Sequence, residues 1–231
     1  MYFNEGKLSK EAILREIDGS LKRLQLDYVD LYIIHRWDYE HPIEETMEAL
    51  NECVKSGKVR YIGCSALFPY QLLKANMIAR EKGWAEFISI QNHYNIIYRE
   101  DERDLTQLIE EEGMQMTPYL PLAAGRVCRM WDEDTKRFNT DAYNKLNYDT
   151  KKDMDFPIVK RIKEIADKLK ISMAQVSIAW LLSKKFIASP VVGCTKLSQL
   201  EDLSEEDIKY LEELYKPHKL SGALKKGEKL I

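Results

Sequence analysis

A histidine ends a short apolar segment near the start of the chain. His35 closes the run Tyr28–His35 (YVDLYIIH), whose apolar and β-branched residues are typical of a buried strand. If this strand belongs to a βα barrel, residues at its carboxyl end face the active site. There an imidazole can orient or polarise a carbonyl group. A structural histidine that bonds to a neighbouring backbone group is the alternative.

Three more segments with strand-like composition end in polar side chains. They end at Ser65 in GCS, at Gln91 and Asn92 in SIQNHYN, and at Tyr119 in TPYLPLAAG. A hydroxyl and a primary amide can hydrogen-bond an amide-bearing ligand, and a tyrosine can stack on a flat ring. Loop entrances are often polar, but the recurrence at several strand ends favours one shared pocket.

A fifth strand-like segment leads into Gly193–Gln199 (GCTKLSQ), just before an expected helix. The first amides of a helix lack intrahelical partners and suit an anion, and Lys196 would add a point charge for a phosphate. The segment is not a GxGxxG fingerprint, so no dinucleotide-binding claim follows from it. An ordinary strand-to-helix turn is the alternative.

Several kinds of site and partner are excluded by composition. The sequence contains no Cys/His cluster with zinc-ligand spacing, no GxSxG elbow and no P-loop, so we expect no metal site. Its 35 basic and 38 acidic residues give a net charge of −3, which argues against a nucleic-acid partner.

The setting of the chain is predicted to be cytoplasmic. No apolar run is long enough for a membrane span, and the first residues have no signal-peptide pattern. The four cysteines are far apart and form no CxxC pair, which favours free thiols in a reducing compartment.

The elements that must position these residues alternate between strands and helices. The expected strands are 28–35, 59–65, 86–91, 114–122 and 186–194. The expected helices are 10–24, 42–56, 69–82, 102–112, 157–169, 172–184 and 204–215. The polar segment 123–156 has no clear period, so it is predicted to be a long loop that shapes the substrate and cofactor pocket.

Buried strands that alternate with helices predict an α/β protein with a parallel sheet. Right-handed crossovers would arrange the units as a barrel or a doubly wound sheet. The 231 residues are expected to form a single domain. Five βα units are too few for an eight-stranded barrel, and three more would need about 90 residues.

The order of motifs resembles the aldo-keto reductase family. The motifs are LDYVDLYIIHRWD, GKVRYIGCS, QNHYN, PYLPLAAGR and PVVGCTKLSQLED, and the resemblance covers residues 8–215. The branch related to voltage-channel β-subunits is the most similar. This resemblance implies a (β/α)₈ TIM barrel that is incomplete here, with its first three units missing. It also implies NADP(H) as cofactor and reduction of an aldehyde or ketone, with a tyrosine as the proton donor.

The resemblance also assigns roles to residues of this sequence. His35 matches the active-site histidine that orients the carbonyl of a small-molecule substrate. Ser65, Gln91 and Asn92 match residues that hold the nicotinamide carboxamide, and Tyr119 matches the aromatic residue that stacks on the nicotinamide.

Two further segments match the rest of the cofactor. Leu122 and Gly125, with Arg126 or Arg129, match the loop around the pyrophosphate. The residues that match the adenosine 2′-phosphate and adenine site are Gly193, Thr195, Lys196, Gln199 and Asp202. Of these, Lys196 favours NADPH over NADH.

The sequence also departs from the family pattern. It contains no DTAxxYG-like segment, so the family's catalytic Asp, Tyr and Lys have no counterpart. Ala66 stands where the family often has Asn or Ser, and Leu120 stands where Ser is usual. The chain is therefore either most of an NADPH-dependent carbonyl reductase or a truncated pseudoenzyme or partner-binding subunit. If the chain is a real truncation, its open barrel edges are expected to promote self-association.

Overall fold

The structure is a computed structural model that describes residues 7–131, 148, 152–192 and 205–214. The chain divides into two compact units. The first unit comprises residues 1–93, 104–119 and 186–189, and the second comprises residues 94–103, 120–185 and 190–231. Each unit is described by itself, and the expected single domain stays a prediction.

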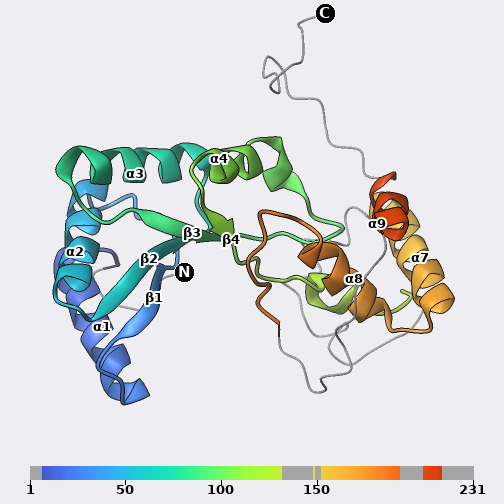
Figure 1. The fold of residues 1–231 in the computed structure, drawn as a ribbon, viewed down its shortest axis with the longest axis horizontal. Helices are drawn as coiled ribbons and strands as arrows, with labels where there is room; N and C mark the ends of the chain where they lie inside the picture. Colours follow the sequence, from blue (N-terminus) through green and yellow to red (C-terminus); the bar gives the residue numbers. More distant parts are fainter. Residues whose placement is uncertain (1–6, 132–147, 149–151, 193–204, 215–231) are drawn as a thin grey trace, which may run out of the picture. The chain divides into compact units, whose positions relative to one another are not determined.

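The first unit is built on a parallel sheet (Figure 1). Its described strands are β1 (Val29–Ile34), β2 (Val59–Ser65), β3 (Phe87–Gln91) and β4 (Gln115–Met116). They lie side by side in chain order, and each neighbouring pair is parallel. The predicted α/β class with a parallel sheet is confirmed, and the arrangement is that of part of a (β/α)₈ barrel.

One helix of this unit precedes β1, and the other three lie between successive strands. They are α1 (Lys10–Leu24), α2 (Ile43–Lys55), α3 (Pro69–Lys82) and α4 (Leu105–Glu111). The bounds of α1 and α3 are those expected from the sequence. Ser9 starts α1, because its side chain accepts a hydrogen bond from the Ala12 amide. Gly83 ends α3 in the left-handed conformation, with φ at 65°, which glycine adopts without strain.

The core of the first unit lies between the sheet and its helices. Ile62, Cys64 and Ile90 of the strands are fully buried, as are Leu50 of α2 and Leu72 of α3. Alternation along a strand sends every second side chain to the opposite face. Tyr61, which directly precedes Ile62, is exposed, and so is Ile88, which lies at the register shift between β2 and β3.

The last two predicted strands of the sheet are shorter than expected. β4 covers Gln115–Met116 and not 114–122, because Pro118 and Pro121 have no amide to donate to a ladder. Within 186–194, the described residues show one parallel bridge, between Ile187 and Met116. The strand expected over 186–194 is therefore shorter in its described part, where Pro190 follows this bridge closely.

The second unit is mainly helical. Its described elements are η1 (Glu100–Arg103), η2 (Ala123–Gly125), α7 (Lys152–Leu169), α8 (Met173–Leu182) and α9 (Glu205–Glu212). α7 packs against both α8 and α9. Trp180 of α8 is fully buried and stacks on Tyr94 with ring centroids 5.7 Å apart. Ser172 caps α8, and Gln175 completes a capping box.

The predicted loop 123–156 ends earlier than expected, because α7 begins by Lys152. Asp153 and Asp155 lie in its first turn, where negative charge suits the helix dipole. Pro157, expected near the start of this helix, lies inside it and leaves one backbone bond unmade. Residues 132–147 and 149–151 of the predicted loop are outside the described part of the chain.

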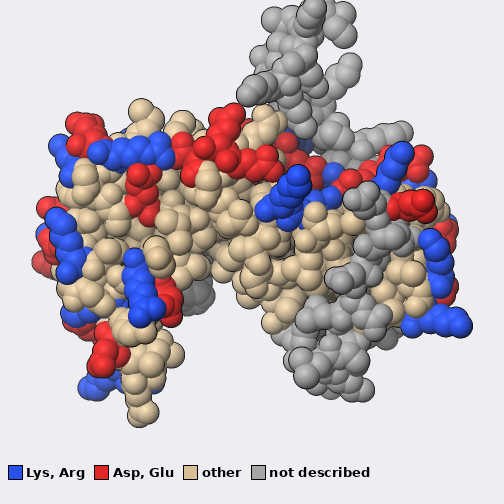
Figure 2. Space-filling view, in the orientation of Figure 1, with Lys and Arg blue, Asp and Glu red and all other residues tan. Residues whose placement is uncertain are grey.

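Charged side chains are interspersed on the surface. On the face drawn in Figure 2, described lysines and arginines lie among aspartates and glutamates. Among the described helices, none is both long and apolar enough to cross a membrane.

Candidate functional site

The predicted strand-end residues of the first unit form a row at the carboxyl edge of the sheet. The last paired residues of β1 and β2 are Ile34 and Cys64, so His35 and Ser65 occupy the next position in register. Ser65 is in turn paired with Gln91 on β3. Adjacent strands lie about 4.8 Å apart, so these three residues are near neighbours.

Hydrogen bonds hold the segment after β2 against the end of β3. The Ser65 hydroxyl donates to the Gln91 carbonyl at 2.6 Å, and the Ala66 amide donates to the same oxygen at 3.2 Å. The Asn92 side-chain amide donates to the Leu67 carbonyl at 3.2 Å. The structure therefore gathers Ser65, Gln91 and Asn92 as the sequence predicted.

One atom of this cluster suits an amide-bearing ligand. Asn92 is 7% exposed, and its Oδ1 is buried without a hydrogen-bond partner among the described residues. An unpaired buried acceptor is costly unless a ligand or water supplies the donor. The Ser65 hydroxyl, which already donates, can also accept. Two acceptors therefore fit the NH₂ of a nicotinamide carboxamide.

Tyr119 joins the row from the segment that follows β4. Its amide donates to the Asn92 carbonyl at 2.9 Å, and it forms a parallel bridge with His93. The Tyr119 ring stacks on the His93 ring, with centroids 5.4 Å apart and an angle of 19° between the planes. Sequence reasoning assigned no role to His93. The available signal was its position two residues after Gln91, which places both on the same side of an extended segment.

His35 is exposed at the end of β1. Partial burial, followed by the charge of Arg36, lowers its pKa and so favours the neutral imidazole. His35 also lines a cavity of about 130 Å³ at the edge of β1, together with Tyr32, Ile33 and Ile13 of α1. The neutral ring can donate one hydrogen bond to a carbonyl oxygen.

Both positions where the sequence departs from the family pattern have left-handed backbone. Ala66 has a φ of 51° and Leu120 has a φ of 53°. This conformation costs a residue with a Cβ about 1–2 kcal/mol, and asparagine tolerates it better. Ala66 therefore carries backbone strain directly beside Ser65.

The loop after Tyr119 belongs to the second unit and contains the predicted pyrophosphate residues. Gly125 has a φ of 93°, and its amide donates to the Leu122 carbonyl at 2.7 Å. The Arg129 guanidinium lies 3.0 Å from the point that a Cβ on Gly125 would occupy. Leu122, Gly125 and Arg129 thus lie together, and the φ of Gly125 favours glycine at this position.

Arg126, the alternative to Arg129 for the pyrophosphate site, lies in a different environment. Its side chain is 4% exposed, and its guanidinium lies 5.1 Å from the centroid of the Tyr148 ring. The Tyr148 hydroxyl accepts a hydrogen bond from Asn95 at 3.0 Å. Arg126 is therefore part of the packed interior of the second unit, and Arg129 is the better candidate for an anion.

The remaining predicted cofactor residues are outside the described part of the chain. They are Gly193, Thr195, Lys196, Gln199 and Asp202. Their assignment to the 2′-phosphate and adenine remains a prediction.

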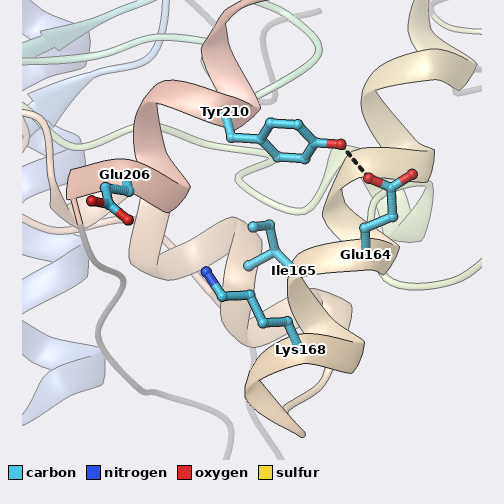
Figure 3. Close-up of a pocket in the computed structure, with 5 residues that line it drawn as sticks. All are labelled: Glu164, Ile165, Lys168, Glu206 and Tyr210. Carbon is cyan, nitrogen blue, oxygen red and sulfur yellow. Dashed lines mark hydrogen bonds between the residues drawn. The ribbon is translucent and has the colours of Figure 1, made fainter.

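A second cavity, of about 370 Å³, lies in the second unit between α7 and α9 (Figure 3). It is lined by Glu164, Ile165, Lys168, Glu206 and Tyr210, and the Tyr210 hydroxyl is hydrogen-bonded to Glu164. None of the residues with a predicted role lines it. Its mixture of two acidic groups and one basic group favours no particular ligand.

Comparison with protein families identifies the chain. The model of the aldo/keto reductase family matches residues 1–216. The chain therefore belongs to the aldo/keto reductase family, as its motifs suggested.

Relatives and a solved structure agree with this assignment. An aldo-keto reductase of Fusarium vanettenii is 38% identical over 96% of this chain and 62% of its own length. A putative aryl-alcohol dehydrogenase of Schizosaccharomyces pombe is 40% identical over 96% of this chain and 64% of its own length. The versiconal hemiacetal acetate reductase of Aspergillus parasiticus is 41% identical over 94% of this chain and 65% of its own length.

The fold is likewise that of a known aldo-keto reductase. The thermostable aldo-keto reductase Tm1743, solved with the inhibitor epalrestat, matches with a TM-score of 0.70 and 28% identity. That match covers 90% of this chain and 68% of the solved chain. The chain spans just under two thirds of the length of the three relatives above.

Proposed function

We propose that this chain is the cofactor-binding and carbonyl-orienting part of an NADPH-dependent reductase that converts an aldehyde or ketone to an alcohol. The observation that carries the proposal is the row formed by His35, Ser65 and Gln91, which continues through Asn92 to Tyr119. The resemblance of the motifs to those of the family assigns each of these residues to nicotinamide or carbonyl binding. The names of two relatives, an aryl-alcohol dehydrogenase and a hemiacetal acetate reductase, support an oxidoreductase.

The first unit would hold the nicotinamide end of the cofactor. Ser65 Oγ and Asn92 Oδ1 would accept hydrogen bonds from the carboxamide, and Tyr119 would stack on the ring. When bound, NADPH supplies the hydride for the carbonyl carbon. In the second unit, Leu122, Gly125 and Arg129 would hold the pyrophosphate. Lys196 and its neighbours would select the 2′-phosphate.

His35 would hold the carbonyl in position. A neutral imidazole N–H aimed at the carbonyl oxygen stabilises the negative charge that develops there, and the lowered pKa of His35 favours this neutral form. The reaction also needs a proton for the alkoxide oxygen. The family's Asp, Tyr and Lys have no counterpart in the sequence, so His35 is the only residue of the family's catalytic set to which this proposal assigns a role.

A turnover assay tests this proposal. NADPH oxidation is followed with aromatic and aliphatic aldehydes for the wild-type chain, His35→Gln and His41→Gln. His41 is a matched control, because it is a half-exposed histidine on the same loop. Its Nδ1 is hydrogen-bonded to Asp38 Oδ2 at 2.8 Å. Because the sequence has no counterpart of the family's proton donor, water must protonate the alkoxide, and turnover by the wild type and by His41→Gln should be about 10²–10⁴-fold slower than with a general acid. His35→Gln should lower this slow rate by about a further 10²-fold. No turnover by the wild type on any aldehyde would contradict the proposal.

A pseudoenzyme or partner-binding subunit that self-associates is the second candidate. It is favoured by the outer edge of β1, which pairs with no other described strand, and by exposed aromatic and aliphatic side chains on the strands. Tyr61 on β2 is 55% exposed and Ile88 on β3 is 45% exposed. Exposed apolar strands and open sheet edges promote pairing with another chain.

Sedimentation velocity over a range of concentrations tests this candidate. We expect the chain to form dimers or larger species and Tyr61→Lys to weaken them. Tyr70→Lys is the control, because Tyr70 is 62% exposed but lies on helix α3. A wild-type monomer at every concentration would rule out self-association.

A cytoplasmic location is also part of the proposal, supported by free thiols at Cys53, Cys64 and Cys128.

A further inference from the structure

The pairing of His93 with Tyr119 defines how the tyrosine ring is held. The two residues bridge the extended segments that continue β3 and β4, and their rings are nearly parallel at 19° with centroids 5.4 Å apart. Offset stacking of this kind is a favoured arrangement of two aromatic rings. It covers one face of Tyr119 and fixes the plane of its ring.

His93 contributes to this pair as an uncharged ring. Burial lowers the pKa of His93 to about 4, since the charged imidazolium would lose its hydration. At neutral pH the imidazole is therefore neutral, and the contact is a stack of two aromatic rings.

The strand that precedes Tyr119 is short. β4 is two residues long, and the neighbouring Pro118 cannot donate to a ladder. The Tyr119 amide does donate to the Asn92 carbonyl at 2.9 Å, which anchors the Cα but leaves the side-chain torsions to packing. The stacked ring of His93 thus contributes to setting the ring plane of Tyr119.

We propose that His93 is a positioning residue of the nicotinamide site, packing against one face of Tyr119 so that the opposite face is presented to the nicotinamide ring. This inference rests on the proposed function, because it assigns NADP(H) to the site. It predicts that the ring of His93, and not its nitrogen atoms, supports cofactor binding. It also predicts that His93 acts only through Tyr119.

Calorimetric titration of the full chain with NADPH separates these roles. His93→Phe keeps a ring and should bind NADPH like the wild type, whereas His93→Gln has no ring and should bind about two- to tenfold more weakly. Adenosine 2′,5′-bisphosphate, which lacks nicotinamide, should bind all three proteins equally. In a Tyr119→Ala background, His93→Gln should cause no further loss, because the contact through which it acts is already gone.

Melting curves of the unliganded proteins accompany the titrations. If His93→Gln is unfolded at the titration temperature, His93→Leu replaces it, since leucine is apolar like phenylalanine but has no ring. Equal NADPH affinity for the variants with and without a ring would overturn the inference and leave the proposed function standing. Tighter binding without the ring would also overturn it, because His93 would then occupy the face that the cofactor needs. A wild-type chain that binds neither ligand would overturn the proposed function, and the inference with it.

Discussion

Asn76 of α3 clamps the irregular start of β3, and its removal should destabilise the sheet. Its Oδ1 accepts a hydrogen bond from the Phe87 amide at 2.9 Å, and its Nδ2 donates to the Phe87 carbonyl at 3.2 Å. The register between β2 and β3 shifts at this point, from Ile62 opposite Phe87 to Gly63 opposite Ser89. The Asn76 side chain thus holds the residue directly before the bulge with two hydrogen bonds.

The size of the effect follows from burial. Asn76 and Phe87 are each 1% exposed, so Asn76→Ala would leave one backbone donor and one backbone acceptor unpaired and away from water. Each such group costs about 1–3 kcal/mol, which gives a total loss of about 2–6 kcal/mol. Domains are stable by about 5–15 kcal/mol, so the variant should lose a large part of its stability.

Urea unfolding followed by circular dichroism measures this loss. Met77→Ala is the matched control, because Met77 is the next residue of α3 and is 58% exposed. The control should stay within about 0.5 kcal/mol of the wild type. The slope of the free energy of unfolding against urea concentration should be the same in both variants. An Asn76→Ala variant as stable as the Met77→Ala control would refute the role assigned to this clamp.

Four further substitutions have expected outcomes. Gly63→Ala should lose about 1–3 kcal/mol in urea unfolding, because its Cβ would lie 2.6 Å from Ser89 Oγ and 3.2 Å from Ser89 O. Gly19→Ala in α1 should instead gain about 0.5–1 kcal/mol, and equal effects of the two would contradict this contrast. Ala66→Gly should raise the melting temperature, because it relieves a φ of 51°, and a lower value would show that the strain is absent. The pKa of His93 is lowered to about 4, so the unfolded chain binds the extra proton below about pH 6.5. Stability should therefore fall as pH drops from 6.5 to 4, and it should fall less in His93→Phe. Equal pH profiles would argue against a half-buried, neutral His93.

The sequence predicts the elements of the first unit well because local signals and packing agree there. α1 begins after the Ser9 cap, and α3 lies between Pro69 and Gly83, as expected. The strand over Val59–Ser65 also has its predicted bounds. Its apolar pattern and its burial between two neighbouring strands favour the same structure.

The errors fall where proline and tertiary pairing decide the structure. Residues 114–122 have the apolar composition of a strand, but Pro118 and Pro121 interrupt the hydrogen-bond ladder that such a strand would form. Pro157 suggested a helix start, yet α7 begins by Lys152 and runs through the proline. The pattern of a single sequence does not show whether a neighbouring element can replace the backbone hydrogen bonds that a proline removes.

Part of the candidate site could be predicted and part could not. Ser65, Gln91 and Tyr119 were found because polar residues at strand ends are visible in the sequence. The orphan acceptor on Asn92 and the stacking of His93 on Tyr119 depend on register and on contacts between segments. Positive φ at Ala66 and Leu120 was also invisible, because neither residue type signals it.

The most direct test of the central claim is the dissociation constant of the wild-type chain for NADPH, measured beside Ser65→Ala and Asn92→Ala. Binding in the micromolar range, weakened about tenfold in each variant, is the predicted result, since each variant removes one acceptor for the carboxamide. No binding by the wild type, or equal binding by all three proteins, would contradict the assignment of this row to a nicotinamide cofactor.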